Sequence, residues 1–240
     1  MNKVIIKEYD EIMEFDESRL EHIPYVYQPI FDVSGDDDIV IGYEALMRPK
    51  NSNPSDYIEK VVEMNDTHRL EFLTFYNAIR QFQERGLSGK LFINSFPYEV
   101  LTPAEFEILK EGMSDELKCN IVIENLEYGD KISLLMLANK ANALRNQGFQ
   151  IALDDFGMGI NSVEMLKFIK PDVVKIDRYY VAGCTKNQIA RNTIEIVTES
   201  IKANKSLVLA EGVETAAEYK FLKSLKDIKY MQGFYLGLPA

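Results

Sequence analysis

From Tyr25 onward, short apolar runs alternate with longer stretches of helical period. The short runs are rich in β-branched and aromatic residues, and they predict strands over Val26–Val33, Ile39–Leu46, Lys90–Phe96, Asn120–Leu126, Gln150–Phe156, Asp172–Ile176, Leu207–Ala210 and Met231–Leu236. The longer stretches predict helices over Pro54–Met64, Arg69–Gln83, Pro103–Gly112, Lys131–Gln147, Ser162–Ile169, Gln188–Ala203 and Ala216–Leu225. Eight strands interleaved with helices in a 240-residue chain predict an α/β fold, a (β/α)8 TIM-like barrel.

The connection between the first two strands departs from this pattern. Only the segment Ser34–Asp38 joins them, and a link that short forms a hairpin. This pair of strands is therefore expected to be antiparallel. The alternative architecture is an open doubly wound sheet, which lacks support because no Gly-x-Gly-x-x-Gly turn follows the first strand.

The first 22 residues differ in composition from the rest of the chain. Seven carboxylates lie between Glu8 and Glu21. We expect residues 1–22 to form a solvated acidic leader, with a short helix carrying Ile12, Phe15 and Leu20 on one side. Because no low-complexity linker divides the remainder, residues 23–240 are expected to form a single barrel domain.

Charge and composition narrow the classes of function. The net charge is −11 and no Lys/Arg run forms a basic patch, which argues against binding of a nucleic-acid polymer. The two cysteines, Cys119 and Cys184, match no metal or redox spacing. The N-terminus turns acidic too early for a secretory signal, and no apolar run approaches the roughly 18 residues of a membrane span. We expect a cytoplasmic protein without membrane insertion.

Polar side chains recur near the carboxyl ends of the predicted strands. They are Glu44, Asn94, Glu124, Asp154 with Asp155, Lys175 and Glu211, and Gln232 stands at the start of the last predicted strand. Barrel strands point their carboxyl ends at one common face, where barrel enzymes place their active sites. These side chains are therefore expected to converge on one patch.

A patch with five acids requires compensating positive charge. Carboxylates gathered without cations repel one another and raise their own pKa values. Oxygen ligands from Asp, Glu and Asn suit Mg²⁺ or Mn²⁺. The only histidines, His22 and His68, lie away from the strand ends, which argues against zinc.

Asp154 and Asp155 are adjacent, and neighbouring residues in a regular strand point to opposite faces. Both can reach one site only if the strand breaks there. Gly157 and Gly159 permit such a break, because glycine tolerates positive φ. One carboxylate could then bridge two cations about 3.5–4 Å apart.

Each feature by itself has an ordinary structural explanation. An Asp-Asp pair before glycine is commonly a turn, and Lys175 could pair with Asp177 or a neighbouring acid. Asn94 could cap a helix start, and Gln232 could be an ordinary hydrogen-bonded polar group. The recurrence of charged groups at most of the successive strand ends favours a common site.

The ordered motifs resemble the EAL domain, the bacterial phosphodiesterase domain that cleaves cyclic di-GMP. The resemblance runs from Tyr27-Gln28-Pro29-Ile30 to the C-terminus. It rests on Glu44-Ala45-Leu46 with Arg48, Asn94, Glu124 with Glu127, Asp154-Asp155-Phe156-Gly157, Lys175-Ile176-Asp177, Ala210-Glu211-Gly212-Val213-Glu214-Thr215 and Gln232-Gly233. It implies a barrel with one antiparallel strand.

The resemblance also implies roles for the site residues. The metal-ligand set it implies is Glu44, Asn94, Glu124, Asp154, Asp155 and Glu211, with Gln232 acting through metal-bound water. Lys175 is implied to orient the attacking water, and Glu211 is also a general-base candidate. Gln28 and Arg48 are implied substrate contacts, with Arg48 on a phosphate. Glu127 is implied to brace the loop after the fifth strand, and Glu214 to be a supporting acid.

The implied reaction is hydrolysis of cyclic di-GMP to linear pGpG by a two-metal activated water. Mg²⁺ or Mn²⁺ would support it, Ca²⁺ is expected to inhibit it, and a homodimer is the expected assembly. Divalent ions lower the pKa of bound water and neutralise the phosphodiester, so an acidic protein can hold an anionic dinucleotide.

The loop after the fifth strand departs from the family pattern. Met158, Ile160 and Asn161 stand where the family usually has threonine, tyrosine and serine, and Asn125 replaces a usual apolar residue. These changes leave two alternatives to an active phosphodiesterase. One is a cyclic di-GMP receptor that does not cleave, and the other is a protein-interaction module with an abandoned site. Because every metal-ligand position is filled, the active enzyme is the favoured interpretation.

Overall fold

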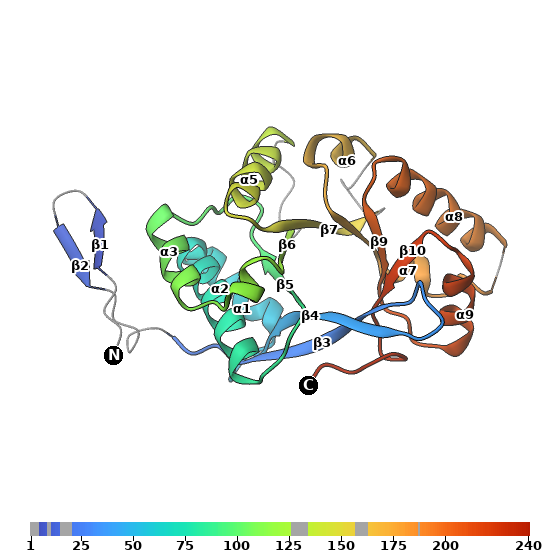
Figure 1. Cartoon of the computed structure of the whole chain (residues 1–240), viewed down its shortest axis with the longest axis horizontal. Helices are drawn as coiled ribbons and strands as arrows, with labels where there is room; N and C mark the ends of the chain where they lie inside the picture. The colour runs from blue at the N-terminus through green and yellow to red at the C-terminus, as the bar shows by residue number, and fades with distance from the viewer. Residues whose placement is uncertain (1–4, 9–10, 15–20, 126–133, 157–162, 187) are drawn as a thin grey trace.

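The barrel closes as predicted from the sequence. A computed structural model describes residues 5–8, 11–14, 21–125, 134–156, 163–186 and 188–240. Eight strands form a closed barrel in the order β10-β3-β4-β5-β6-β7-β8-β9 (Figure 1). Their bounds are β3 Tyr25–Asp32, β4 Ile39–Met47, β5 Lys90–Ser95, β6 Ile121–Asn125, β7 Gln150–Phe156, β8 Val173–Ile176, β9 Leu207–Ala210 and β10 Ile228–Met231.

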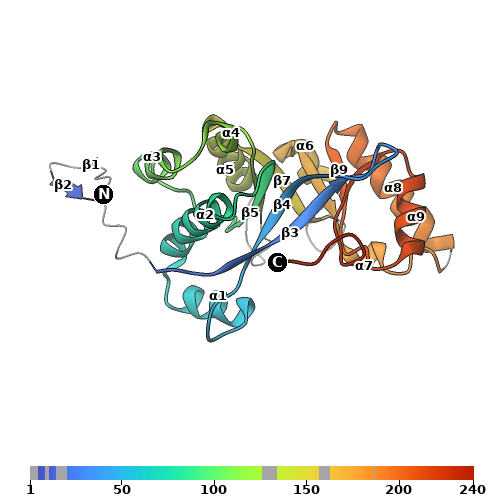
Figure 2. The same ribbon diagram turned by 60° about the horizontal axis from the view of Figure 1, so that its bottom comes forward.

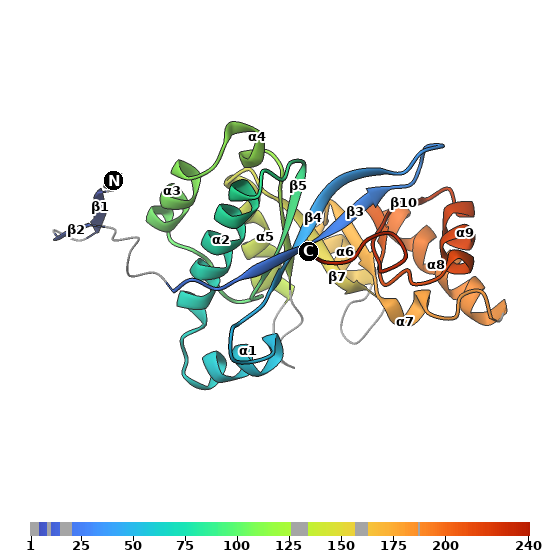
Figure 3. The same ribbon diagram turned by 90° about the horizontal axis from the view of Figure 1, so that it is seen from below.

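One strand, β3, runs against all the others. It pairs antiparallel with β4 on one side and with β10 on the other, whereas the remaining neighbours are parallel. The predicted hairpin across Ser34–Asp38 is confirmed, and Figure 3 shows β3 and β4 side by side. As a result, β3 begins at the end of the barrel where the other strands finish, and Gln28 lies opposite Glu44.

The barrel interior carries an apolar layer just beneath the site. Its members are Ile30, Phe92, Val122, Ala152, Val173, Leu209 and Tyr230. Side chains alternate across a strand, so the next inward position is two residues further along. On β5 to β10 those positions are Asn94, Glu124, Asp154, Lys175, Glu211 and Gln232. On the reversed β3 the position is Gln28, two residues before Ile30. The pleat therefore places the site residues in one layer.

The helices surround the strands on the outside (Figures 2 and 3). Their bounds are α1 Pro54–Glu63, α2 Thr67–Glu84, α3 Pro103–Glu111, α4 Asp115–Lys118, α5 Leu134–Asn146, α6 Val163–Ile169, α7 Arg178–Val181, α8 Gln188–Ala203 and α9 Ala216–Ser224. Capping boxes start α3, with Thr102 and Glu105, and α9, with Thr215 and Glu218. None of the helices in these described segments has the length and apolar content to cross a membrane.

Two sequence predictions need correction. The last strand is Ile228–Met231 rather than Met231–Leu236, so Gln232 directly follows its strand, as Glu211 does, instead of standing near its start. The leader contains a two-stranded hairpin, β1 Ile5–Glu8 with β2 Glu11–Glu14, so the helix expected around Ile12 is wrong. A period-2 alternation competes with the helical period over so short a segment. Phe15 and Leu20 lie outside the described residues. The short helices α4 and α7 were not anticipated.

Candidate functional site

A lysine surrounded by carboxylates occupies the carboxyl end of the barrel. Lys175 Nζ lies 2.7 Å from Glu211 Oε1, 2.8 Å from Glu124 Oε1, 3.1 Å from Asp154 Oδ1 and 3.7 Å from Glu44 Oε1. The side chains of Lys175 and Glu124 are only 1% and 0% exposed. The structure therefore brings together five of the predicted residues, and Lys175 pairs with the acids rather than with Asp177, which caps α7.

Burial dominates the electrostatics of this cluster. It raises the pKa of Glu124 well above the usual range, and Lys175 offsets only part of that effect. Burial likewise raises the pKa of Glu211. For Lys175, burial opposes the charged form, but Asp154, Glu124, Glu211 and Glu44 together raise its pKa. The lysine is thus held charged, whereas burial disfavours the ionised forms of Glu124 and Glu211.

Amide side chains complete one wall of the site. Asn94 Nδ2 donates to Glu44 Oε1 at 3.3 Å, and Gln232 Nε2 donates to Glu44 Oε2 at 2.7 Å. Gln232 Nε2 also donates to Gln28 Oε1 at 3.2 Å, and Gln28 Nε2 donates to the carbonyl of Gly237 at 3.1 Å. The two glutamines therefore orient Glu44 from the β3–β10 side of the barrel.

The strand break predicted at Asp154-Asp155 is present, but it lies before the two glycines that were expected to permit it. The pairing of β7 with β8 shifts register between Leu153 and Phe156. Asp155 itself adopts the left-handed conformation, with φ 49°, so the break comes before Gly157 and Gly159, which lie outside the described residues. An aspartate tolerates this conformation better than most residues.

The break turns Asp155 toward the cluster. One carboxylate oxygen each from Asp154, Asp155 and Glu211 lie within 4.8 Å of one another. Burial and the neighbouring Asp154 raise the pKa of Asp155 to about 6. The adjacent aspartates therefore both reach the same cluster of carboxylates, and their role as metal ligands stays a prediction.

The cluster opens into a cleft of about 240 Å³. Its lining includes Gln28, Glu44, Asp154, Lys175, Glu211 and Gln232, together with Arg178, Glu214 and Phe234. Arg178 Nη2 pairs with Glu214 Oε1 at 2.8 Å. Sequence reasoning missed Arg178 and Phe234, although a basic residue three positions after the strand-end Lys175 was a usable signal.

Arg48 does not join this cluster in the described structure. Arg48 is exposed at the end of β4, where Nη1 donates to the carbonyl of Met47 at 2.8 Å. It lines a second cavity of about 240 Å³, which Asn94 also lines. Glu127 and the altered positions Met158, Ile160 and Asn161 lie outside the described residues.

The donor set fits a hard divalent cation. All the charged donors are carboxylates, which such cations prefer. Glu124 Oε2 and Gln232 Oε1 are buried without a hydrogen-bond partner among the described residues, and Glu124 Oε1 is close to Lys175 without hydrogen-bond geometry. A buried carboxylate oxygen without a partner costs free energy unless a cation satisfies it. Glu44, Asn94, Glu124, Asp154, Asp155 and Glu211 could thus hold metal.

Curated relatives cover nearly the whole of this chain but extend well beyond it. Cyclic di-GMP phosphodiesterase PdeR of Escherichia coli is 26% identical over 231 residues, which are 89% of this chain and 33% of the relative. Cyclic di-GMP phosphodiesterase TpdA of Vibrio parahaemolyticus is 27% identical over 208 residues, 87% of this chain and 36% of the relative. The chain therefore spans about a third of the length of these relatives.

Solved structures share the fold. A standalone versatile EAL protein from Vibrio cholerae, in its c-di-GMP bound form, has a TM-score of 0.80 at 25% identity, covering 91% of this chain and 92% of that one. A manganese and cyclic di-GMP complex of Klebsiella pneumoniae BlrP1 has a TM-score of 0.78 at 23% identity, covering 92% of this chain and 56% of that one.

The family model for the EAL domain matches residues 15–239. This range contains the whole barrel and every residue of the acidic cluster around Lys175. The chain therefore belongs to the EAL domain family.

Proposed function

We propose that this domain hydrolyses cyclic di-GMP to linear pGpG with the help of two Mg²⁺ or Mn²⁺ ions. Water adds to one phosphorus, the bond from that phosphorus to the 3′ oxygen breaks, and the leaving oxygen takes up a proton. The proposal is supported by relatives named as cyclic di-GMP phosphodiesterases and by a related structure described in its c-di-GMP bound form.

The observation that carries the proposal is the ring of acids around Lys175, with Glu124 wholly buried. When Glu44, Glu124, Asp154, Asp155 and Glu211 are ionised, five negative charges and the single Lys175 charge leave a net −4. Two divalent ions would neutralise that charge. When bound, such ions polarise a phosphodiester and lower the pKa of a water.

The residues of the chain then have distinct roles. The charged amine of Lys175 donates a hydrogen bond that holds the attacking water in place. Glu211, whose Oε1 is 2.7 Å from Lys175 Nζ, accepts a proton from that water. Gln232 and Gln28 orient Glu44. Gln28 and Arg48 contact the substrate, Arg48 through a phosphate. Glu214 supports the cleft wall through Arg178, and Glu127 braces the loop after β7.

The test is turnover by the purified protein with Mg²⁺ or Mn²⁺, with the product identified by chromatography. We expect pGpG from the wild type, no product from Glu44→Ala, and inhibition by added Ca²⁺. Glu107→Gln, an exposed substitution on α3, is the matched control and should leave the rate unchanged. No turnover with either metal would reject the proposal.

A receptor that binds cyclic di-GMP without cleaving it is the second candidate. It is favoured by the altered loop, in which Met158, Ile160 and Asn161 depart from the family pattern. Calorimetric binding of the nucleotide with no pGpG over long incubation would select this function.

The assembly and location also belong to the proposal. We expect a homodimer, which is the assembly that the resemblance to the family implies, and a cytoplasmic location. Sedimentation with and without cyclic di-GMP tests the assembly, and a strictly monomeric protein under both conditions contradicts it.

A further inference from the structure

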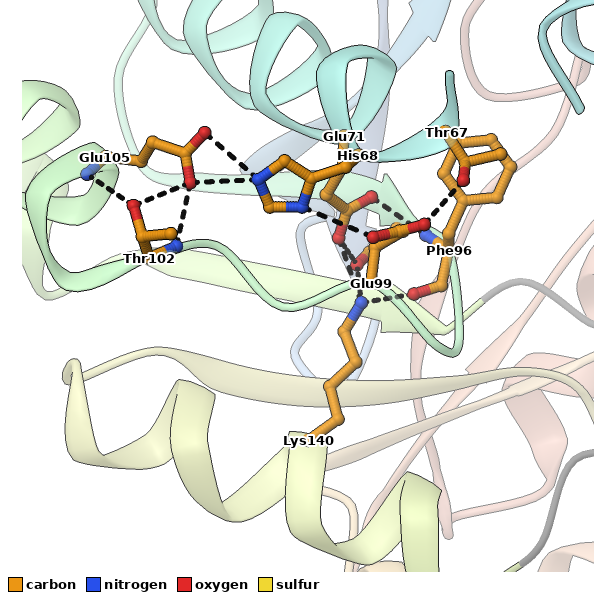
Figure 4. Close-up of polar contacts among 9 residues, drawn as sticks. Thr67, His68, Glu71, Phe96, Glu99, Thr102, Glu105 and Lys140 are labelled. Atoms are coloured by element: carbon orange, nitrogen blue, oxygen red, sulfur yellow. Dashed lines mark hydrogen bonds and ion pairs between the residues drawn. The ribbon is translucent and has the colours of Figure 1, made fainter. Parts of the chain in front are cut away.

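Two buried charges lie outside the barrel, behind the strand that carries Asn94. Glu71 on α2 and Lys140 on α5 are each 2% exposed, and Lys140 Nζ lies 2.9 Å from Glu71 Oε1. Figure 4 shows Lys140 reaching up from α5 to meet Glu71 on α2. The proposed reaction gives neither residue a direct role.

This ion pair holds the two residues that follow Asn94. Ser95 Oγ donates to Glu71 Oε1 at 2.5 Å, and the Phe96 amide donates to Glu71 Oε2 at 2.9 Å. Lys140 Nζ donates to Ser95 Oγ at 2.6 Å and to the Phe96 carbonyl. The Ser95 hydroxyl and both backbone polar groups of Phe96 are therefore bound by one pair of side chains.

Stability alone does not account for the pair. Burial raises the pKa of Glu71 and lowers the pKa of Lys140, and in both cases it is the largest effect, ahead of their mutual attraction. Buried ion pairs of this kind can often be replaced by apolar residues without loss of stability. A functional demand on the end of β5 would explain why charges are placed here.

The end of β5 is part of the acidic site. Asn94 directly precedes Ser95, and its Nδ2 donates to Glu44 Oε1 at 3.3 Å. In the register with β6, Asn94 lies opposite Glu124 and Ser95 lies opposite Asn125. Glu71 and Asn94 also line the same cavity. Any shift of the Ser95–Phe96 backbone would therefore move Asn94 relative to Glu44 and Glu124.

We infer that Glu71 and Lys140 form a positioning pair that fixes the end of β5, so that Asn94 stays beside Glu44 and Glu124 for cation binding. The inference rests on the proposed function, because it assigns Asn94 to the metal site. The pair touches neither cation nor substrate and acts through the Ser95–Phe96 backbone.

His68 on α2 contacts two glutamates that follow the Ser95–Phe96 segment in the chain, and these contacts provide a matched comparison. His68 Nδ1 lies 3.3 Å from Glu99 Oε2, and His68 Nε2 lies 3.2 Å from Glu105 Oε1 (Figure 4). The His68 side chain is 46% exposed. Exposed contacts contribute little to holding a backbone in place, so His68 is expected to matter far less than Lys140.

The experiment starts from metal-depleted protein and measures two quantities for each variant. They are the affinity for added Mn²⁺ and the free energy of unfolding. The double variant Glu71→Leu/Lys140→Met removes both charges, and urea unfolding measures whether it stays as stable as the wild type. We expect calorimetric titration to give Mn²⁺ binding about tenfold weaker in this variant, the lower end of the range for outer residues of metal sites. His68→Gln should bind Mn²⁺ within about twofold of the wild type, because its contacts are exposed.

Wild-type Mn²⁺ affinity in a stably folded double variant would overturn the inference. If that variant fails to fold, Lys140→Gln is tested in its place. The inference would also be overturned if Lys140→Gln bound Mn²⁺ as tightly as the wild type. Glu44→Ala separates this failure from that of the proposed function. If the wild type binds Mn²⁺ and Glu44→Ala does not, an unaffected double variant counts against the positioning pair alone. If the wild type binds no Mn²⁺, both proposals fail.

Discussion

At the scale of single residues, the site is a set of acids gathered around one lysine. Glu124 shows the cost most clearly, because its carboxyl is wholly buried and neither oxygen has a hydrogen-bond partner in the described segments, although Oε1 lies 2.8 Å from Lys175 Nζ. Burial raises its pKa well above the usual range, because burial disfavours the ionised form. Such a residue is retained at the expense of stability when it serves a ligand.

Glu124→Gln should therefore separate stability from metal binding. The substitution keeps the shape and removes the cost of burying or protonating a carboxylate, so we expect the metal-free protein to gain about 0.5–2 kcal/mol in unfolding free energy. Mn²⁺ affinity should fall, because an anionic oxygen ligand is lost. Urea unfolding in chelator and calorimetric titration measure the two quantities.

The control is the exposed Glu107→Gln on α3, which should change neither the stability nor the affinity. A loss of metal-free stability in Glu124→Gln would contradict the view that the buried charge is costly.

At the scale of elements, the turn after β9 shapes the cleft wall. Gly212 has φ 64°, and a Cβ there would lie 2.5–2.9 Å from the Arg178 side chain, which belongs to α7. The glycine thus allows both the left-handed turn and the close passage of Arg178 on its way to Glu214. Arg178 of α7 thereby contacts both Gly212 and Glu214 in the β9–α9 turn.

Gly212→Ala and Gly86→Ala form a matched pair that tests this coupling. Gly86 has φ 66°, but a Cβ there would meet nothing within 4 Å. Gly86→Ala should cost only the left-handed strain, about 1–2 kcal/mol of unfolding free energy. Gly212→Ala should cost more and raise the KM for cyclic di-GMP, because Arg178 is displaced. Equal losses of stability and equal KM values would show that the contact with Arg178 does not matter.

At the scale of the whole molecule, the barrel converts residues far apart in sequence into one charged patch. Glu44 and Glu211 come from opposite halves of the chain, yet both lie within 3.7 Å of Lys175 Nζ. Folding without metal must therefore bring like charges together against their repulsion. A cation bound among these acids in the folded state would relieve this repulsion.

Mn²⁺ should therefore stabilise the whole domain. At a free concentration of 100 times Kd, a single site adds about 2.7 kcal/mol to the unfolding free energy. For a domain of this size, each kcal/mol corresponds to about 2–4 °C in melting temperature. Scanning calorimetry measures the shift, with a sodium salt at matched ionic strength as the control. Glu44→Ala should lose the shift, and an unchanged melting temperature in the wild type would contradict the metal site.

Much of this arrangement could be predicted from local patterns. The period of the apolar residues marked seven of the eight barrel strands and misplaced the last one, and the short Ser34–Asp38 link predicted the antiparallel pair. The strand-end acids were recognisable because charge is rare at the end of a buried strand. The leader was misjudged, because its short alternating segments carry too weak a period to separate strand from helix.

The sequence by itself determined the barrel class and the membership of the acidic cluster, because strand period and strand-end chemistry are both local properties of the chain. Only the tertiary structure decided that Lys175 is the common partner of four acids and that Asp155 takes the left-handed turn. It also decided that Arg178 reaches Glu214, and that Glu71 and Lys140 meet behind Asn94. These contacts join distant segments, and their geometry depends on barrel closure and strand register, which no local pattern encodes.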